Sequence, residues 1–414
     1  MKVALVHDFL VEFGGAERVL EALCEIYPKA PIYTAFYKKG STAYKRFKDK
    51  KIIASWAQNV PLFASRLHSP LRFLAPLIWG RFSTKGPSFG WDFSGFDLVI
   101  TSASWYVTKG VKRRGPSTHS VNSGSSTCSA RSGSQHTVEV CYCHTPPRYL
   151  YGYRTSVDYK KNPLIQAYAV FINHFVRMYD YEAAQRVDYF IANSEEVKRR
   201  IQKFYRRESK VIYPPVDVRR FARKTQNSKR LKQEKAIDIS HLSLSNYFLT
   251  VSRLAGAKNI DLIVEVCKNL KLPLKVVGTG RDEAKLREMA EGSAVKILGE
   301  VADQELIELY QNCRAVIFAA SEEDFGIVPV EAMAAGKPVI ALAQGGVLET
   351  VVDGKTGVYF DQATAGSLTQ AINNFQKLEK KEAFDSKLIK AHAQKFSKER
   401  FKREIEKFVE GKIK

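Results

Sequence analysis

The segment with the clearest chemical pattern holds two carboxylates eight positions apart, Glu323 and Glu331. Glu323 follows an apolar run that predicts a buried strand, and Glu331 lies inside a helical pattern. The residues that lead into that helix are Phe325, Gly326, Ile327 and Val328. A helix N-terminus presents unpaired backbone N–H groups and the positive end of the helix dipole, so we expect an anion to bind over these four residues.

The same two acids allow other interpretations. Glycoside hydrolases also use a carboxylate pair, with separations of roughly 5–9.5 Å. Eight residues along a continuous helix would separate Glu323 and Glu331 by about 12 Å, which is longer than the separation in a hydrolase pair. The hydrolase alternative is therefore weaker, but it stays open because Gly326 interrupts the helical pattern. An acidic cluster that only caps a helix is the structural alternative.

Two cations and a glycine loop predict a phosphate site in the same half of the chain. Arg253 follows a predicted strand, and its guanidinium fork can bind two phosphate oxygens, while Lys258 adds a compact charge. Gly278, Thr279 and Gly280 follow the next predicted strand, and the glycines would allow a nucleotide to approach the backbone closely. Alone, these residues are also typical of surface cations and of a tight turn.

The first half of the chain offers a second group of candidates. Gly14 and Gly15 join an apolar run at Val3–Val6 to a helical pattern, which reads as strand, glycine loop and helix. His144 directly follows another apolar run, Val138–Cys143. A tight turn and a structural histidine are the alternatives to a functional role.

The order of the predicted elements explains how these residues could meet. Short apolar runs alternate with helical stretches in both halves, which predicts two doubly wound α/β domains with parallel sheets. Ligands bind such sheets at the carboxyl ends of the strands, where all the candidates lie. The predicted strands are 3–6, 31–36, 51–56, 96–101, 138–143, 188–192 and 210–213, then 248–252, 274–277, 295–298, 315–318 and 338–342.

The domain boundaries follow from the same pattern. We expect one domain over residues 1–213 and a second over 214–395, joined at the rigid Pro214-Pro215 turn. An amphipathic helix within 396–414 is expected to pack back on the first domain. Residues 115–137 form an insert rich in Ser, Gly and Thr, which predicts a surface loop.

The charge of the chain points to polyanionic partners. Its 414 residues include 65 Lys and Arg against 43 Asp and Glu, a formal net charge of +22. Such a charge suits nucleic acid, an anionic membrane or a polyanionic substrate, and it is also compatible with a solvated basic surface. No nucleic-acid-binding signature accompanies it, so we expect no nucleic-acid role.

A membrane surface is a specific hypothesis for residues 44–91. No apolar run reaches the roughly 20 residues of a membrane span, so a cytoplasmic protein, peripheral at most on the inner membrane face, is expected. The stretch could dock on an anionic bilayer or form internal core with snorkelling cations. Its apolar residues are Trp56, Leu62, Phe63, Leu67, Leu71, Phe73, Leu74, Leu77, Ile78, Trp79 and Phe82.

The six cysteines are few for this length. None is arranged in the paired CxxC spacing of a zinc site, and Cys141 and Cys143 lie in an apolar run. We expect buried thiols and no metal site at these positions.

Taken together, the acidic and basic motifs resemble the retaining GT-B glycosyltransferases of family four, also called group 1. The likeness runs from Val3 to about Phe360, apart from the insert and residues 219–245. It implies that two Rossmann-like domains face each other across a cleft, with the acceptor at the first and the nucleotide sugar at the second. It also implies that Glu323 contacts the donor hexose and Glu331 the ribose.

The resemblance assigns the remaining candidates as well. Arg253 and Lys258 look like the family's diphosphate clamp, and the loop of Gly278, Thr279 and Gly280 would lie at the diphosphate. The Gly14-Gly15 loop would lie beside donor phosphate and acceptor. His144 matches a histidine near the transferred sugar.

The implied activity is metal-independent hexosyl transfer with retention at the anomeric carbon. Transfer on the front face, with the leaving diphosphate taking the acceptor proton, would explain why no enzyme base stands out. No Asp-x-Asp pair occurs, so a metal-bound diphosphate is not expected, and no cofactor is implied.

The donor and acceptor are expected from a narrower likeness. Residues 141–148 resemble bacterial GDP-mannose-dependent transferases, which favours mannose and GDP-mannose, with a lipid-linked or surface-polysaccharide acceptor. A sugar-nucleotide epimerase of the same fold and a non-catalytic sugar-nucleotide-binding protein remain alternatives.

Overall fold

A computed structural model describes residues 1–64, 68, 71–79, 91–106, 108–111, 113, 136–153, 163–222 and 246–413. The chain divides into two compact units, Met1–Pro215 with Phe401–Lys414, and Val216–Arg400. The first unit runs to Pro215, two residues beyond the boundary at residue 213 that the sequence predicts. Residues 114–135, which make up nearly all of the expected insert, lie outside the described residues. Thr137, its last residue, is buried and donates a hydrogen bond to Phe96 O, so it belongs to the domain and not to a surface loop.

The first unit is built on a seven-stranded sheet in which every pairing is parallel. The strand order is β3-β2-β1-β4-β5-β6-β7, so the direction of winding reverses between β1 and β4. Such a reversal is where doubly wound sheets bind ligands. The strands are β1 (Val3–His7), β2 (Ile32–Thr34), β3 (Ile52–Ala54), β4 (Leu98–Ala103), β5 (Val138–Cys143), β6 (Tyr189–Ala192) and β7 (Ser209–Val211).

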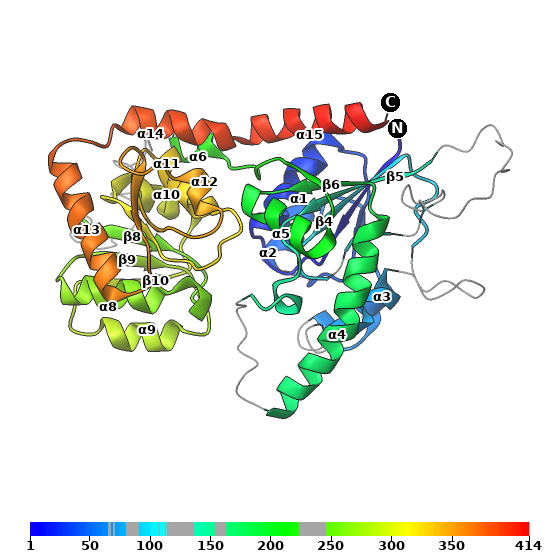
Figure 1. Cartoon of the computed structure of the whole chain (residues 1–414), viewed down its shortest axis with the longest axis horizontal. Coiled ribbons are helices and arrows are strands. Elements are labelled where there is room, and N and C mark those ends of the chain that lie inside the picture. Colours follow the sequence, from blue (N-terminus) through cyan, green and yellow to red (C-terminus); the bar gives the residue numbers. More distant parts are fainter. Residues whose placement is uncertain are drawn as a thin grey trace, which may run out of the picture. The chain divides into compact units, whose positions relative to one another are not determined.

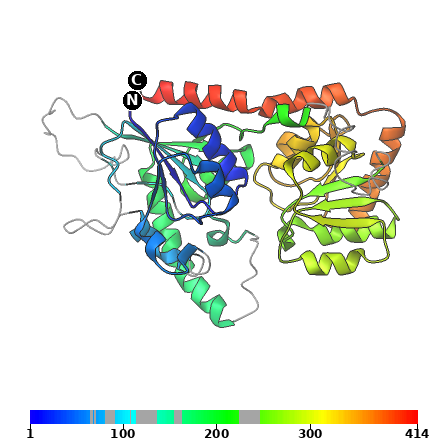
Figure 2. The ribbon, with the colours of Figure 1, turned by 180° about the vertical axis from the view of Figure 1, so that it is seen from behind.

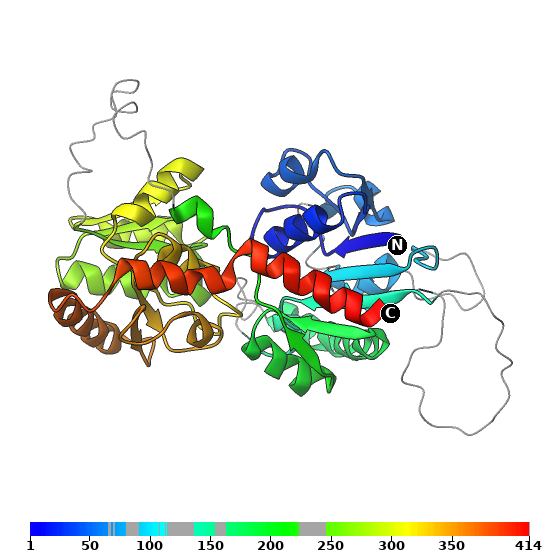
Figure 3. The same cartoon turned by 90° about the horizontal axis from the view of Figure 1, so that it is seen from above.

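Helices cover both faces of this sheet. The α-helices of the unit are α1 (Gly15–Ile26), α2 (Thr42–Phe47), α3 (Ala75–Ile78), α4 (Pro163–Arg186) and α5 (Glu195–Tyr205), with the short helices η1 (Trp56–Asn59), η3 (Arg72–Leu74) and η4 (Arg148–Leu150). The last helix, α15 (Lys398–Ile413), packs Phe401, Ile405 and Val409 into the core shared by α1 and the strands (Figures 2 and 3). The apolar face predicted for this helix is therefore buried against the first unit.

The described part of the aromatic stretch at residues 44–91 forms core and not a membrane-facing surface. Phe63, Ile78 and Trp79 are buried, and they pack in one cluster with residues of β1 and β4. Trp79 also donates a hydrogen bond to Tyr106 O at 2.9 Å. Of the alternatives open from the sequence, internal core is the correct one for the described residues, because only Leu62 and Phe73 are exposed. The other described side chains are buried or half-buried, whereas Leu67 and Phe82 lie outside the described residues.

The second unit repeats the doubly wound plan with six parallel strands. Their order, β10-β9-β8-β11-β12-β13, reverses between β8 and β11. Figure 1 shows β8, β9 and β10 of this sheet side by side. The strands are β8 (Phe248–Val251), β9 (Leu274–Val277), β10 (Val295–Gly299), β11 (Val316–Phe318), β12 (Val339–Leu342) and β13 (Gly357–Phe360). The helices are α6 (Val218–Ala222), η7 (Gly256–Lys258), α8 (Ile260–Asn269), α9 (Glu283–Ala290), α10 (Asp303–Asn312), α11 (Ile327–Ala334), α12 (Val347–Thr350), α13 (Ala365–Lys380), α14 (Ser386–Ala393) and η8 (Gln394–Phe396).

The described cysteines are buried free thiols, as expected. They are Cys24, Cys141, Cys143, Cys267 and Cys313, and Cys128 lies outside the described residues. Burial raises the pKa of Cys141 and of Cys313 to about 12, which keeps both thiols protonated and unreactive near neutral pH. Within the described part of the chain, no helix has both the length and the apolarity to span a bilayer.

Candidate active site

Two loops of the second unit meet at the point where its strand order reverses. One follows β8 and carries Lys258, and the other follows β11 and carries Glu323. Asn259 Nδ2 donates to Ala319 O and to Ser321 Oγ, each at 2.8 Å. These bonds join two segments that are about 60 residues apart in sequence, so the basic and acidic motifs form one local structure.

Lys258 and Glu323 are in direct contact. Lys258 Nζ lies 2.5 Å from Glu323 Oε2, and the two side chains keep 28% and 20% of their surface exposed. A half-buried pair of this kind is screened less than a surface pair but remains open to a ligand. The Arg253 side chain is exposed on the same loop. The structure thus brings Lys258, the cation expected to bind phosphate, into contact with Glu323, the carboxylate expected to bind the hexose.

The glycine loop after β9 packs against the Arg253 loop through its backbone. Ser252 N donates to Val277 O at 3.0 Å, and Leu254 N donates to Thr279 O at 2.9 Å. A Cβ at Gly278 would lie 1.9 Å from Ser252 O, and one at Gly280 would lie 2.2 Å from Leu254 O. The glycines are therefore required by this close packing, and the ligand approach expected from the sequence stays a prediction.

The expected anion-binding helix is α11. It begins at Ile327, directly before Val328. Its N-cap residue is Gly326, with a φ of 89°, which has no side chain to cap the first turn. Phe325 is buried against Phe396, with ring centroids 5.5 Å apart, and this contact fixes the turn. A glycine at the N-cap is compatible with the anion binding expected at this helix N-terminus, which stays a prediction.

A fourth loop supports Glu323 and was not predicted. Gly346 N donates to Glu323 O at 2.8 Å, and a Cβ at Gly345 would lie 2.2 Å from that same oxygen. Glu322, directly before Glu323, has a φ of 56°, which costs conformational energy in a residue other than glycine. The Gly345-Gly346 pair after the predicted strand 338–342 was the available signal in the sequence.

Glu331 is buried and held by a tyrosine. Its Oε2 accepts a hydrogen bond from Tyr310 Oη at 2.9 Å, and only 2% of the residue is exposed. Tyr310 lies on α10 and packs edge-to-face on Phe221, with centroids 5.2 Å apart. No sequence argument pointed to Tyr310, because the contact depends on how α10 and α11 pack.

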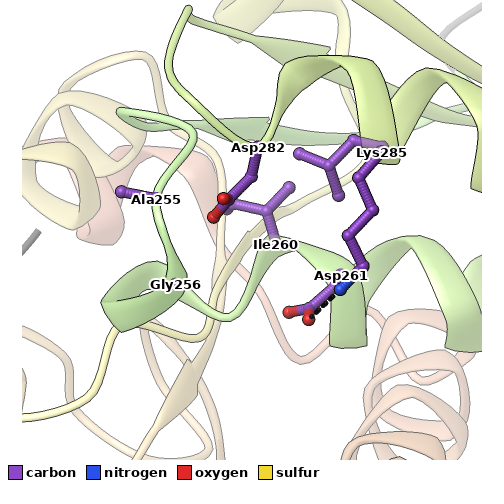
Figure 4. A pocket seen from close by; sticks show the side chains of 7 residues that line it. Ala255, Gly256, Ile260, Asp261, Asp282 and Lys285 are labelled. Carbon is purple, nitrogen blue, oxygen red and sulfur yellow. Dashed lines mark hydrogen bonds and ion pairs between the residues drawn. The ribbon is translucent and has the colours of Figure 1, made fainter. Parts of the chain in front are cut away.

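A small pocket beside the loop that carries Arg253 does not suit a nucleotide sugar (Figure 4). It encloses about 10 Å³, close to the volume needed by one water, whereas sites for small-molecule ligands measure roughly 300–1,000 Å³. Two of its side chains are the carboxylates Asp261 and Asp282, which would repel a diphosphate. Its lining residues are Ala255, Gly256, Ile260, Asp261, Asp282, Lys285 and Leu286.

In the first unit, His144 belongs to a buried chain of hydrogen bonds at the end of β1, β4 and β5. His144 Nε2 lies 2.8 Å from Ser102 Oγ, which lies 3.0 Å from His7 Nδ1. His7 Nε2 lies 3.3 Å from Glu17 Oε1, and Gly14 N donates to Glu17 Oε2 at 2.8 Å. The structure thereby connects the expected histidine to the Gly14-Gly15 loop.

The direction of these hydrogen bonds follows from the acid at the end of the chain. A carboxylate can only accept, so a neutral His7 donates from Nε2 to Glu17 and accepts at Nδ1. Ser102 must then donate to His7, and its remaining lone pairs accept from His144 Nε2. In this arrangement of donors and acceptors, the proton of His144 is on Nε2.

The residues that join His144 to Gly14 in this series of hydrogen bonds were missed by sequence reasoning. His7, Glu17 and Ser102 are each at most 8% exposed, and they come from three separated segments. His7 directly follows the first predicted strand, 3–6, which was the one signal that could have singled it out. Nearby, Asp8 accepts from Ser104 N and Trp105 N at 3.0 and 2.6 Å, which orders the loop after β4.

Two doubly wound parallel-sheet domains, joined in one chain, define the GT-B class of glycosyltransferase folds. The chain belongs to glycosyltransferase family 4. The profile described as "Glycosyltransferase Family 4" matches residues 13–220, and the profile described as "Glycosyl transferases group 1" matches residues 232–409.

Individual relatives are more distant. The chain is 27% identical over 264 residues to the alpha-1,3/1,6-mannosyltransferase ALG2 of Dictyostelium discoideum, covering 56% of this chain and 60% of ALG2. It is 27% identical over 225 residues to the D-inositol 3-phosphate glycosyltransferase of Corynebacterium urealyticum, covering 48% of this chain and 51% of that protein. The matched region thus spans about half to three fifths of the length of these relatives.

A solved structure supports the fold over the whole chain. HepE from Anabaena, in a crystal structure with UDP and glucose, superposes with a TM-score of 0.66 at 19% identity. The match covers 99% of this chain and 100% of HepE. At this identity the likeness establishes the architecture only.

Proposed function

We propose that the protein transfers a hexose from a nucleotide-diphosphate sugar, with retention at the anomeric carbon and without a metal ion. The observation that carries the proposal is the contact between Lys258 and Glu323 beside the N-terminus of α11. A cation and a helix N-terminus suit a diphosphate, and a carboxylate suits sugar hydroxyls and a cationic anomeric carbon.

Each candidate residue has a role in this proposal. Arg253 and Lys258 bind the diphosphate with the backbone of residues 325–328. The loop of residues 278–280 also lies at the diphosphate and supports the Arg253 loop. Glu331, held by Tyr310, binds the ribose, and Glu323 binds the hexose. In the first unit, the Gly14-Gly15 loop binds donor phosphate beside the acceptor, and His144 acts at the transferred sugar.

The donor sugar is proposed as mannose, from GDP-mannose. The named activity of ALG2, an alpha-1,3/1,6-mannosyltransferase, supports a mannosyl donor. HepE has been crystallised with UDP-glucose, which makes UDP-glucose the second donor to test. For the acceptor we propose a lipid-linked or surface-polysaccharide glycan, since such an acceptor is compatible with the basic charge of the chain.

The proposed chemistry needs few enzyme groups at the anomeric carbon. As the bond to the diphosphate breaks, negative charge grows on the phosphate oxygens and positive charge on the sugar ring. Fixed cations stabilise the first charge and Glu323 stabilises the second. The acceptor oxygen bonds to the anomeric carbon on the face from which the diphosphate leaves, which retains the configuration, and the leaving diphosphate takes the acceptor proton.

A transfer assay with the full chain tests this function. We expect turnover with GDP-mannose and a lipid-linked acceptor, product of retained configuration by NMR, and an unchanged rate after addition of EDTA. Loss of activity with EDTA, restored by Mg²⁺ or Mn²⁺, would contradict metal independence. Conversion of the donor sugar without acceptor would instead identify an epimerase, and nucleotide binding without turnover a binding protein.

The hydrogen-bond chain to His144 makes a separate prediction. Ser102→Ala should lower kcat about tenfold with little change in the donor KM, because His144 remains present but its tautomer is no longer fixed. The ¹⁵N shifts of the His144 ring should report a mixture of tautomers, and the pH dependence of kcat should move with them. Ser104→Ala, whose hydroxyl bonds Asp8 instead, is the control and should leave both unchanged. A single unchanged tautomer in Ser102→Ala would contradict the proposed chain.

A further inference from the structure

The loop after β4 carries a half-buried tryptophan, Trp105, that the proposed function does not use. It lies at the point where the strand order of the first unit reverses, between β1 and β4. Asp8, directly after β1, accepts hydrogen bonds from Ser104 N and Oγ, from Trp105 N and from Thr108 Oγ1. Asp8 is only 3% exposed, and burying a carboxylate costs free energy unless hydrogen bonds compensate for the lost water. Its four hydrogen bonds therefore hold this irregular loop in one conformation.

Aromatic neighbours fix the orientation of the Trp105 ring without stacking flat on it. The indole centroid lies 5.2 Å from Tyr149, 5.6 Å from Tyr106 and 6.4 Å from Phe9, at interplanar angles of 53°, 40° and 89°. His68 lies 6.1 Å away at 57°. Among the described residues, no aromatic ring in contact with Trp105 lies parallel to the indole. Parallel stacking on this ring is therefore not used within the described chain.

The indole N–H of Trp105 is also not used. Trp79 Nε1 donates to Tyr106 O at 2.9 Å, and Trp56 Nε1 donates to Leu77 O at 3.5 Å. In the part of the chain that the structure describes, Trp105 Nε1 has no acceptor, and it is not among the buried polar atoms that lack a partner. This N–H is therefore open to solvent and can donate a hydrogen bond to a ligand.

Trp105 lies at the same edge of the sheet as His144. Ala103 pairs with Cys143 in the sheet, and His144 N donates to Ala103 O at 2.9 Å. Trp105 follows Ala103 by two positions, so the loops that carry Trp105 and His144 leave this edge side by side. Tyr149, in the chain that follows His144, donates from its hydroxyl to Trp105 O at 3.3 Å and joins the two loops. The tryptophan is thus held beside the segment proposed to act at the transferred sugar.

We propose that Trp105 binds a sugar ring of the acceptor glycan, which stacks on the indole and accepts a hydrogen bond from Nε1 through a hydroxyl. This inference rests on the proposed function, which assigns the acceptor to the first unit. The face of an indole carries partial negative charge, so it attracts C–H groups that neighbouring oxygens polarise, as in a pyranose ring. A nucleobase could also stack on this face, but the nucleotide is proposed to bind at the second unit.

Saturation-transfer NMR of the full chain with methyl α-mannopyranoside and methyl α-glucopyranoside tests the contact without turnover. We expect the wild type to saturate the ring C–H signals of at least one glycoside. Trp105→Ala should bind that glycoside about tenfold more weakly, because it removes both the stacking surface and the donor. Trp105→Phe keeps an aromatic face and loses only the N–H, so we expect a loss of about threefold.

Trp56→Phe is the matched control. Trp56 is also half-buried, and its N–H donates to a backbone carbonyl inside the same aromatic core, so this variant should bind glycosides like wild type. Circular dichroism verifies the fold of each variant. Where Trp105→Ala does not fold, the loss expected for Trp105→Phe decides the test.

The proposal fails if the wild type saturates neither glycoside, or if both Trp105 variants bind like wild type. It also fails if Trp56→Phe loses as much affinity as Trp105→Phe, since the loss would then reflect damage to the shared core. Titration with GDP identifies the stacking partner: weaker GDP binding by Trp105→Ala would make Trp105 a nucleobase contact and reject the acceptor assignment. Glycoside binding that depends on Trp105, without turnover on any donor, would contradict the transferase proposal and leave the sugar contact standing.

Discussion

Glu323→Gln is expected to lower kcat/KM roughly a hundredfold while leaving the affinity for free nucleoside diphosphate nearly unchanged. The carboxylate contacts Lys258 at 2.5 Å, and a neutral amide can neither balance that cation nor stabilise positive charge on the sugar ring. Because the sugar becomes cationic only near the transition state, the lost interaction appears mainly in kcat.

Glu331→Gln should give the contrasting result. The ribose is present in both the free nucleotide and the donor, so both should bind about 10–100-fold more weakly after loss of a charged hydrogen bond worth ~1.5–3 kcal/mol. Tyr310 can still donate to the glutamine oxygen, so the side chain should keep its position. The substitution therefore removes the charge of Glu331 without changing how its side chain packs.

Steady-state kinetics and calorimetric titration with nucleoside diphosphate separate the two acids. Glu322→Gln, at the position directly before Glu323, is the matched control and should behave like wild type in both measurements. Full activity of Glu323→Gln, or equal loss of nucleotide affinity in both acid variants, would contradict the assigned division of roles. Wild-type nucleotide affinity in Glu331→Gln would remove the ribose assignment.

Most strands could be predicted from the sequence because buried parallel strands read as short apolar runs. The predicted ranges 138–143 and 274–277 coincide with β5 and β9, and the others agree within a few residues. The prediction omitted β13 and the helices α13 and α14, which lie at or beyond the end of the motif-rich segment. It also omitted α4, whose exposed apolar residues obscure the usual amphipathic pattern.

The contacts within the candidate site could be predicted less well than its residues. The motifs around Lys258 and Glu323 were recognisable separately, but their ion pair joins positions 65 residues apart and depends on β8 lying next to β11. His7, Ser102 and His144 likewise meet because β1, β4 and β5 are neighbours in the sheet. Strand order is a property of the whole fold, and local sequence patterns do not encode it.

Gly278→Ala is expected to destabilise the second unit by about 2–5 kcal/mol and to abolish tight nucleotide binding. The new Cβ would lie 1.9 Å from Ser252 O, and the φ of 130° is one that an alanine rarely adopts. Ser252 N also donates a hydrogen bond to Val277 O in β9, so neither segment can move away without breaking that hydrogen bond. Thermal unfolding followed by circular dichroism should show a Tm lowered by roughly 5–15 °C.

Gly292→Ala provides the control that separates the steric clash from the backbone strain. Gly292 also has a positive φ, 68°, but a Cβ there would meet nothing within 4 Å. Its substitution should therefore cost only about 1–2 kcal/mol and leave nucleotide affinity unchanged.

If both variants lost the same stability, strain alone would explain Gly278. If Gly278→Ala kept wild-type nucleotide affinity, the glycine loop would not support the Arg253 loop in the way that its geometry implies. A larger loss of stability together with loss of nucleotide binding, confined to Gly278→Ala, would establish that the packing of these two backbones shapes the diphosphate site.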